Sequence, residues 1–303
     1  MQPPLAIAVR NRHDRQGARR HTKELTMLET FRESAGLWRI PLPTPTLPPA
    51  TATNHYLVGE RQAVLVDPSA PALANQDKLV ALLAAAAQQG VAVTALFLTH
   101  HHQDHMGAAA ALRARLDLPV WAHARTAALL PELAVDRLVA DGETVAVNAD
   151  GTPWLAVHTP GHAPGHLCLW HAATAMLVAG DMVAGEGTIL VDPRDGHMGD
   201  YLASLDKMAH LQPRAPAPAH GQVLHEALAV LTHYRLHRLA REHKVLEALP
   251  LTWTAPDALL PTAYGDVSRL AWPIALRSMQ SHLIHLAELG RAERDATRWR
   301  RLA

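Results

Sequence analysis

One nine-residue stretch, Thr99–Gly107, constrains what this chain can fold into more than any other feature of the sequence. It consists of Thr-His-His-His-Gln-Asp-His-Met-Gly, so five of its nine residues can bind a metal ion through an imidazole or a carboxylate. It directly follows the apolar run 91–98, whose length and composition predict a buried strand. With 21 histidines in 303 residues, a polar surface loop is the alternative. The spacing His-x-His-x-Asp-His after a strand favours a metal site.

Hydrophobic periodicity on both sides of this stretch predicts an alternation of strands and helices. Before residue 123 we expect strands at 53–58, 63–66, 91–98 and 118–122, and helices at 73–89 and 107–116. After residue 143 we expect strands at 144–147, 154–158, 167–170 and 176–179, and a helix at 201–211. This order predicts a layered α/β fold, and its two successive β-rich halves are compatible with two packed sheets.

The last quarter of the chain predicts a separate, mainly helical domain. Residues 223–249 indicate one or two long helices, and residues 277–290 an amphipathic helix that ends at Gly290. We therefore expect three parts: a disordered extension over 1–26, a catalytic domain over 27–229 and a helical domain over 230–303.

Charge is distributed unevenly, although 28 basic and 28 acidic residues cancel over the whole chain. Residues 1–26 and 230–303 each carry a net charge of +4, whereas 27–229 carries −8, part of which divalent cations would offset. Five arginines cluster near the C-terminus: Arg291, Arg294, Arg298, Arg300 and Arg301. A solvated helix end is the favoured interpretation of this cluster, and contact with RNA is the alternative.

The single cysteine, Cys168, lies in an apolar segment and predicts packing rather than catalysis. It cannot form a disulfide within the chain, which favours a reducing compartment. No apolar run approaches the roughly 20 residues of a membrane span, and the N-terminus shows no signal pattern. We therefore expect a cytoplasmic protein without a membrane partner.

Spacing within the histidine-rich stretch separates its side chains into groups. His100 and His102 lie two residues apart, so their side chains can point the same way, and His101 should then point elsewhere, in a supporting or packing role. Asp104 and His105 fall on the next turn and can face a second metal ion. One ion cannot easily take all four ligands from so short a loop and keep an open position.

Further metal-binding residues follow predicted strands elsewhere in the chain. His162 is the middle histidine of 158–166 and has a Pro-Gly pair on either side. Asp181 directly follows an apolar strand, and a carboxylate there can bridge two cations. His220 lies in Ala-His-Gly, and Asp67 is a weaker candidate that could orient a ligand imidazole instead.

Together these motifs resemble the metallo-β-lactamase superfamily over residues 37–222. The resemblance implies a four-layer αββα sandwich with two divalent metal ions at one edge of the sheets. It assigns His100, His102 and His162 to the first metal, Asp104, His105 and His220 to the second, and Asp181 as the bridge. The region from His237 to Arg291 resembles the winged-helix-like domain of a subgroup that includes the lactamase-β-like protein 2 family. Such a domain could cover the active-site mouth or mediate a homodimer.

The predicted chemistry is hydrolysis by a water molecule that two metal ions activate to hydroxide. Asp104 would hold the second metal and also orient this nucleophile. Zinc is the expected metal, although iron and manganese suit the same ligands. Aspartate rather than cysteine at the bridging position resembles the thioesterase, lactonase and nuclease branches.

We expect a small ester or thioester substrate, as in glyoxalase-II-like enzymes. Cleavage of single-stranded RNA, and a non-enzymatic regulator that binds metal and nucleic acid, are the alternatives. The segment 183–201 follows the bridging residue, and some of Ile189, Leu190, Met198 and Tyr201 could line the substrate pocket.

Overall fold

The computed structural model describes residues 30–303, so the predicted extension 1–26 lies outside the described residues. The first half of the body contains β1 (Phe31–Ser34), β2 (Leu37–Pro43), β3 (Ala52–Val58), β4 (Gln62–Val66), α1 (Leu73–Gln88), β5 (Ala92–Phe97), α2 (Gln103–Met106), α3 (Ala109–Leu116), β6 (Val120–Ala122), α4 (Ala124–Ala128) and β7 (Arg137–Leu138). The second half contains β8 (Thr144–Val147), β9 (Pro153–His158), β10 (Leu167–His171), β11 (Met176–Gly180), α5 (Met198–His210), β12 (Ala215–Pro218) and α6 (Ala227–Ala248).

The strands form two sheets that meet at one corner. Strands β1 to β7 are neighbours in chain order in the first sheet, and β8 to β12 are neighbours in chain order in the second. The corner is the pairing of Gln62 on β4 with Val147 on β8. The pairs β4–β5 and β11–β12 are parallel, so the strands of each pair end at the same edge of their sheet. Residues that follow these strands are therefore brought together there.

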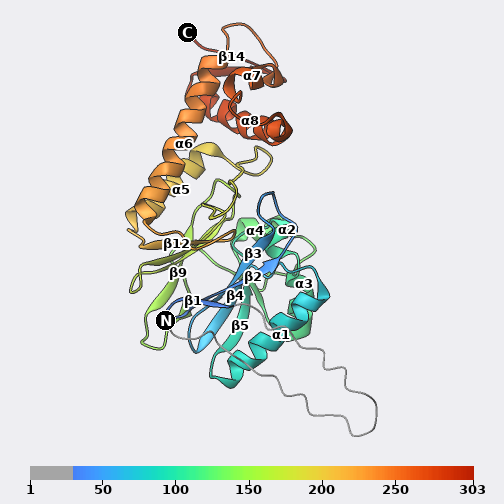
Figure 1. Ribbon diagram of the computed structural model, residues 1–303, viewed down its shortest axis with the longest axis vertical. Helices are drawn as coiled ribbons and strands as arrows, with labels where there is room; N and C mark the ends of the chain where they lie inside the picture. The colour runs from blue at the N-terminus through green and yellow to red at the C-terminus, as the bar shows by residue number, and fades with distance from the viewer. Residues whose placement is uncertain (1–29) are drawn as a thin grey trace.

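Alternating side chains on single strands define the layers. On β4, Val64 and Val66 face the core between the two sheets, whereas Leu65 packs with α1 and α3. On β10, Leu169 faces the same inter-sheet core, whereas Cys168 packs with α5 and α6. Helices cover the outer face of each sheet, so both sheets are buried on both faces (Figure 1). The predicted four-layer αββα sandwich is therefore confirmed.

The prediction from sequence did not include β2 or β12, because both strands contain two prolines. Strand β12 lies at the edge of the second sheet and pairs only with β11, so its prolines remove no hydrogen bond that a second neighbour needs. On β2, Pro41 and Pro43 lie beyond the part that pairs with β1, which reaches only Arg39. Both strands therefore tolerate their prolines, because no strand pairs with these residues on one side.

The C-terminal elements lie at one end of the molecule, beyond α5 (Figure 1). They are η1 (Pro256–Leu259), α7 (Leu260–Ala263), η2 (Arg269–Ala271), α8 (Trp272–Glu288), β13 (Ala292–Asp295) and β14 (Arg298–Arg301). They pack with the end of α6 around a core of their own, which includes Leu246, Met279, Leu283 and Trp299. Helix α6 runs through the predicted boundary at 229/230, and that boundary stays a prediction.

The prediction that the C-terminal arginines form a helix end is wrong. Gly290, at φ 69°, follows α8, and residues 292–301 then form the hairpin β13–β14. Trp299 is buried in the domain core, whereas Arg298 and Arg300 alternate with it along the strand. More buried and less buried side chains therefore alternate with the period of two that is typical of a strand. None of the helices within residues 30–303 is both long and apolar enough to cross a membrane.

Candidate metal centre

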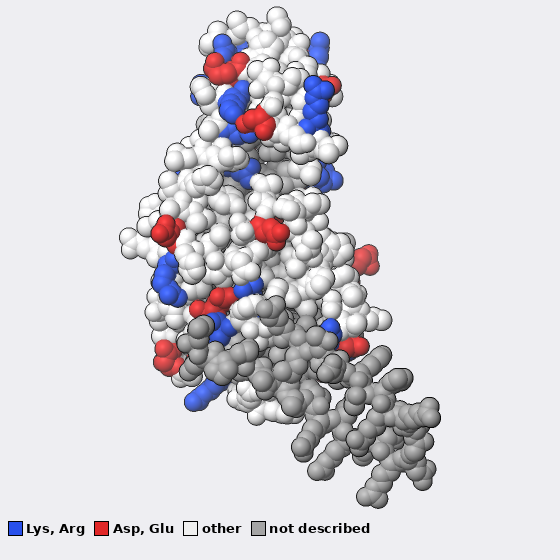
Figure 2. All heavy atoms as spheres, in the orientation of Figure 1, with Lys and Arg blue, Asp and Glu red and all other residues white. Residues whose placement is uncertain are grey.

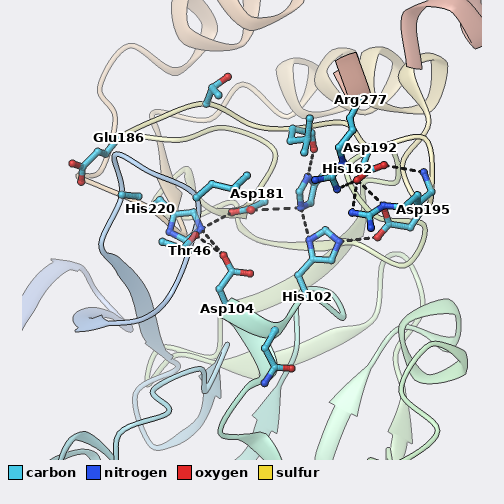
Figure 3. Close-up of a pocket in the computed structure, with 16 residues that line it drawn as sticks. Thr46, His102, Asp104, His162, Asp181, Glu186, Asp192, Asp195, His220 and Arg277 are labelled. Carbon is cyan, nitrogen blue, oxygen red and sulfur yellow. Dashed lines mark hydrogen bonds and ion pairs between the residues drawn. The ribbon is translucent and has the colours of Figure 1, made fainter. Parts of the chain in front are cut away.

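The predicted metal ligands come from the ends of four strands. The loop after β5 carries His100 and His102, and the short helix α2 carries Asp104 and His105. The remaining ligands follow other strands: His162 follows β9, Asp181 follows β11 and His220 follows β12. The side chains of His102, Asp104, His162, Asp181 and His220 point toward one hollow (Figure 3). The structure thus brings all seven predicted ligands to one edge of the two sheets.

Three imidazole nitrogens form a compact triangle. The Nε2 atom of His100 lies 3.0 Å from Nδ1 of His102, and Nε2 of His162 lies 3.2 and 3.0 Å from these two atoms. Nitrogen ligands of a tetrahedral zinc ion lie about 3.4 Å apart, given bonds of about 2.1 Å. The triangle therefore has nearly the dimensions that one such ion needs.

A second group of donor atoms lies beside the first. Ligand atoms of Asp104, His105 and His220 all lie within 4.8 Å of one another. Asp181 lies between the two groups, since its Oδ2 atom is 3.5 Å from Nε2 of His162 and its Oδ1 atom is 3.5 Å from Nε2 of His220. A carboxylate in this position can contact cations in both groups.

The outer nitrogen of each imidazole is held by an acceptor, which fixes the ring and its tautomer. Backbone carbonyls accept from Nδ1 of His162 (Leu190, 2.8 Å) and of His220 (Ala52, 2.9 Å). Carboxylates accept from Nε2 of His102 (Asp195, 2.7 Å) and from Nδ1 of His105 (Asp67, 2.8 Å). The Thr99 hydroxyl donates its proton to Asp67 (2.7 Å), so it accepts from Nδ1 of His100 at 3.0 Å.

When the three rings of the triangle are neutral, this arrangement leaves each of their inner nitrogens with a lone pair and no proton. Lone pairs at 3.0–3.2 Å repel one another unless a cation lies between them. Two further inner atoms, Nε2 of His105 and Oδ1 of Asp181, are buried and have no hydrogen-bond partner among the described residues. Buried polar atoms are rarely left in that state. The donor set therefore fits a pair of divalent cations.

Electrostatics at the centre follow from burial and from the two carboxylates. Burial and the neighbouring imidazoles hold the pKa of His100 well below its ordinary value. Burial would also lower the pKa of His105, but Asp181 and Asp67 raise it well above that value. Burial opposes ionisation of Asp181, yet His105 and His220 hold its pKa well below the usual range. Asp181 is thus a carboxylate in a site that favours positive charge.

His166 positions Asp181 rather than joining the donor groups. Its Nε2 atom accepts a hydrogen bond from the backbone N–H of Asp181 at 3.1 Å, and its Nδ1 atom donates to the Thr159 hydroxyl at 2.8 Å. Burial holds its pKa well below the ordinary value, so the ring stays neutral and can accept. Gly180, at φ 49°, has no Cβ to collide with this ring.

The structure also locates the residues that were predicted to have lesser roles. His101 is not part of the triangle, and its Nε2 atom lies 3.0 Å from Asp195. His101, His102 and Asp195 form a further group of potential ligand atoms within 4.8 Å. Cys168 is fully buried, and burial raises the pKa of its thiol to about 12, which agrees with a packing role.

A cavity of about 450 Å³ lies over the donor groups. Leu190 lines it, whereas Ile189 and two residues of α5, Met198 and Tyr201, are buried in the hydrophobic core. Sequence reasoning missed several lining residues, among them Thr46, Glu186, Asp192, Arg194, Asp195 and Arg277. They come from loops and from α8, where no strand or motif pattern marks a position as part of a site.

Comparison with known proteins defines the class. The family model described as "Metallo-beta-lactamase superfamily" matches residues 48–220, and the chain belongs to this superfamily of hydrolases. The model described as "Beta-lactamase associated winged helix domain" matches residues 255–299. The chain is therefore an enzyme of this superfamily with an associated winged-helix domain, as the sequence motifs indicated.

Individual relatives show which members of the superfamily the chain resembles. A "Beta-lactamase-like protein 2 homolog" from Drosophila melanogaster is 28% identical over 253 residues, which cover 79% of this chain and 83% of that relative. An "Atrochrysone carboxyl ACP thioesterase" from Aspergillus chevalieri is 31% identical over 200 residues, covering 65% of this chain but only 60% of that relative. The resemblance to the lactamase-β-like protein 2 subgroup is confirmed.

Solved structures show the same fold. A metallo-beta-lactamase family protein from Thermus thermophilus has a TM-score of 0.71 at 23% identity and covers 88% of this chain and 99% of that chain. A beta-lactamase domain protein from Burkholderia ambifaria has a TM-score of 0.77 at 21% identity and covers 90% of this chain and 94% of that chain. At these identities the likeness concerns the fold.

Proposed function

We propose that this protein hydrolyses a small thioester or ester with the help of two divalent metal ions, zinc being the expected metal. The observation that carries the proposal is the set of five imidazoles whose inner nitrogens face one space beside Asp104 and Asp181. In this set His100, His102 and His162 would hold the first ion. Asp104, His105 and His220 would hold the second, and Asp181 would contact both.

Two metal ions, when bound, lower the pKa of water and stabilise negative charge that develops on the substrate oxygen. The residues of the chain prepare the site for this chemistry. Asp195 and Asp67 accept from His102 and His105 and so keep these rings from turning. The Thr46 hydroxyl donates to Oδ2 of Asp104 at 2.6 Å, which fixes the carboxylate that faces the cavity. Asp104 can thereby accept a hydrogen bond from water and orient it.

The reaction balances without a covalent enzyme intermediate. The oxygen of water bonds to the carbonyl carbon, and the carbon–sulfur bond of the thioester breaks. One proton of the water is transferred to the departing thiolate, and the products are a carboxylic acid and a thiol. The name of the Aspergillus relative, a thioesterase, supports this choice of substrate class.

Ion pairs in the C-terminal domain argue against RNA as the substrate. Three of the five C-terminal arginines pair with carboxylates: Arg298 with Asp295 (2.7 Å), Arg300 with Glu293 (2.6 Å) and Arg301 with Glu247 (3.4 Å). On the face in Figure 2, basic and acidic side chains of this domain lie next to one another. A polyanion needs several unpaired Lys or Arg contacts, so this surface favours a small substrate.

A panel of acyl thioesters and lactones, assayed with and without a chelator, tests the proposal. We expect thioester turnover that the chelator abolishes and added zinc restores. Asp104→Asn should lower kcat on the same substrates by about 100-fold or more. A panel without chelator-sensitive turnover would reject the proposal. Labelled single-stranded RNA, cut by the wild-type protein and not by Asp104→Asn, would favour a nuclease instead, and retention of DNA without any turnover would favour a regulator. The cytoplasmic location and the homodimer stay predictions.

A further inference from the structure

Two arginines form one wall of the cavity, and the proposed metal centre uses neither of them. Arg194 lies in the loop between β11 and α5, and Arg277 lies on α8 of the C-terminal domain. Among the described residues that line the cavity, Arg277 alone comes from beyond α6. Figure 3 shows Arg277 beside Asp192 and His162, on the side of the cavity away from Glu186. The C-terminal domain therefore contributes a positive charge to the active site.

A single buried carboxylate holds both guanidinium groups. Asp192 is 5% exposed, and its Oδ2 atom accepts from Nε and Nη2 of Arg194 at 3.0 and 2.7 Å. Arg277 forms an ion pair with the same oxygen atom. Two positive charges on one carboxylate leave a local charge of +1. Each guanidinium has five N–H donors, so most of the donors on this pair remain available.

No second carboxylate among residues 30–303 pairs with either arginine. Asp195, which directly follows Arg194 in the sequence, is already bound to His101 and His102. The carboxylates of Asp104 and Asp181 lie at the metal centre, where their charge faces the two proposed cations. The cavity therefore has a metal-binding end and a separate cationic wall.

We infer that the substrate carries an anionic group, a phosphate or a carboxylate, and that Arg194 and Arg277 bind this group while the scissile ester lies at the metal centre. The inference rests on the proposed hydrolase function and extends it to the class of substrate. A guanidinium matches the geometry of both anions and binds either one through paired N–H donors. Asp192 acts as a positioning residue, because it keeps the two guanidinium groups together.

A second cavity adjoins one of these arginines. Arg194 also lines this cavity of about 590 Å³, between the loop at Pro193 and the C-terminal domain. Leu276, Ile284 and Arg294 line that cavity as well. A substrate that extends beyond its anionic group would have room there. The anion can thus belong to the acyl chain, as a carboxylate, or to the leaving group, as a phosphate with more of the molecule behind it.

Four thioesters separate these two sources of charge. Butyryl-pantetheine is the neutral reference, succinyl-pantetheine adds a carboxylate to the acyl chain, and butyryl-4′-phosphopantetheine adds a phosphate to the leaving group. Succinyl-4′-phosphopantetheine carries both. For the metal-loaded protein we measure kcat/KM on each and take the ratio of each charged substrate to its neutral partner. This ratio removes effects that all four substrates share.

We expect the ratio for at least one source of charge to exceed one in the wild-type protein. In Arg194→Gln and Arg277→Gln it should fall at least about fivefold, since each removes a charged donor to the anion. Arg277→Lys, which keeps the charge, should retain more of the ratio than Arg277→Gln does. Arg298→Gln is the matched control, because Arg298 also pairs with one aspartate but lies outside both cavities. Its ratios should equal those of the wild-type protein.

Arg194 is 74% exposed, so its substitution leaves the fold intact even if the loss of Arg277 disturbs the contact between the domains. Ratios that neither glutamine variant changes would overturn the inference. If none of the four thioesters is turned over, the panel of thioesters and lactones decides the proposed function, and calorimetry decides the anion site. In that case 4′-phosphopantetheine or succinamate should bind the metal-loaded wild-type protein more tightly than pantetheine or butyramide, their neutral counterparts. Equal binding of charged and neutral compounds would reject the site.

Discussion

The Nδ1 atom of His105 lies 2.8 Å from Oδ2 of Asp67, and both side chains are buried. Asp67 accepts two further hydrogen bonds, from the backbone N–H and the hydroxyl of Thr99, each at 2.7 Å. Its own backbone has φ 53°, a left-handed conformation that non-glycine residues rarely adopt. One strained residue therefore orients His105 directly and His100 through Thr99, although it contacts neither proposed metal ion.

This relationship predicts that Asp67→Asn weakens metal binding without removing a ligand. Loss of the carboxylate lowers the basicity of His105 and loosens its orientation, so metal affinity should fall about 10- to 100-fold. Competition with a chromophoric chelator measures the affinity. Asp77→Asn is the control, since Asp77 is exposed and forms an ion pair with Arg115 at the surface. Equal affinity in Asp67→Asn and the wild-type protein would disprove the role given to Asp67.

The two neighbouring histidines predict opposite results for metal content. His102 belongs to the nitrogen triangle, whereas His101 contacts Asp195 and is not part of that triangle. His101→Ala should keep two metal ions per chain, and His102→Ala should lose one of them. Elemental analysis after dialysis against a weak chelator measures both contents. If His101→Ala were the variant that loses an ion, the donor set would have to be redrawn around Asp195.

A buried histidine away from the donor groups predicts how stability depends on pH. Nε2 of His55 accepts from the backbone N–H of Ser69 at 3.1 Å, and its Nδ1 atom lies 3.2 Å from the Thr53 carbonyl. Burial lowers the pKa of His55 from 6.5 to about 4. Between these values the unfolded chain binds the proton and the folded chain does not, so stability falls as the pH drops. From pH 7 to pH 5 the loss is about 2 kcal/mol.

Urea unfolding at both pH values, with a chelator present, measures this contribution. His55→Gln should be less stable than the wild-type protein at pH 7, and its own loss between pH 7 and pH 5 should be smaller by about 2 kcal/mol. The other buried histidines titrate alike in both proteins, so their contributions to the pH-dependent loss of stability cancel in the comparison. His225→Gln, at an exposed position, should keep the wild-type loss. A His55→Gln variant with the full wild-type loss would contradict the account.

Local spacing explains why most of the metal centre could be predicted from the sequence. His100, His102, Asp104 and His105 lie on one loop directly after a strand, so their grouping needs no knowledge of the rest of the fold. His162, Asp181 and His220 were each candidates on their own, and the resemblance to the superfamily then assigned them to the two metal ions. The alternation of apolar strands and helices predicted the layers, because each strand buries both faces.

The cationic wall could not be predicted in this way. Asp192 and Arg277 are far apart in the chain and meet only because α8 packs against the loop after β11. Neither residue follows a strand, and a single Asp or Arg in a loop or on a helix is ordinarily a solvated surface group. The C-terminal hairpin escaped prediction for a different reason, since its arginines hide the alternation that places Trp299 in the core.

Anomalous X-ray diffraction at the metal edge, from crystals of the purified protein, shows whether these seven side chains hold two metal ions. We predict two anomalous peaks about 3.5–4 Å apart. One should lie among the inner nitrogens of His100, His102 and His162, the other among Asp104, His105 and His220, with Asp181 contacting both. A single peak, or peaks centred on His101 and Asp195, would contradict a two-metal centre built from these seven side chains.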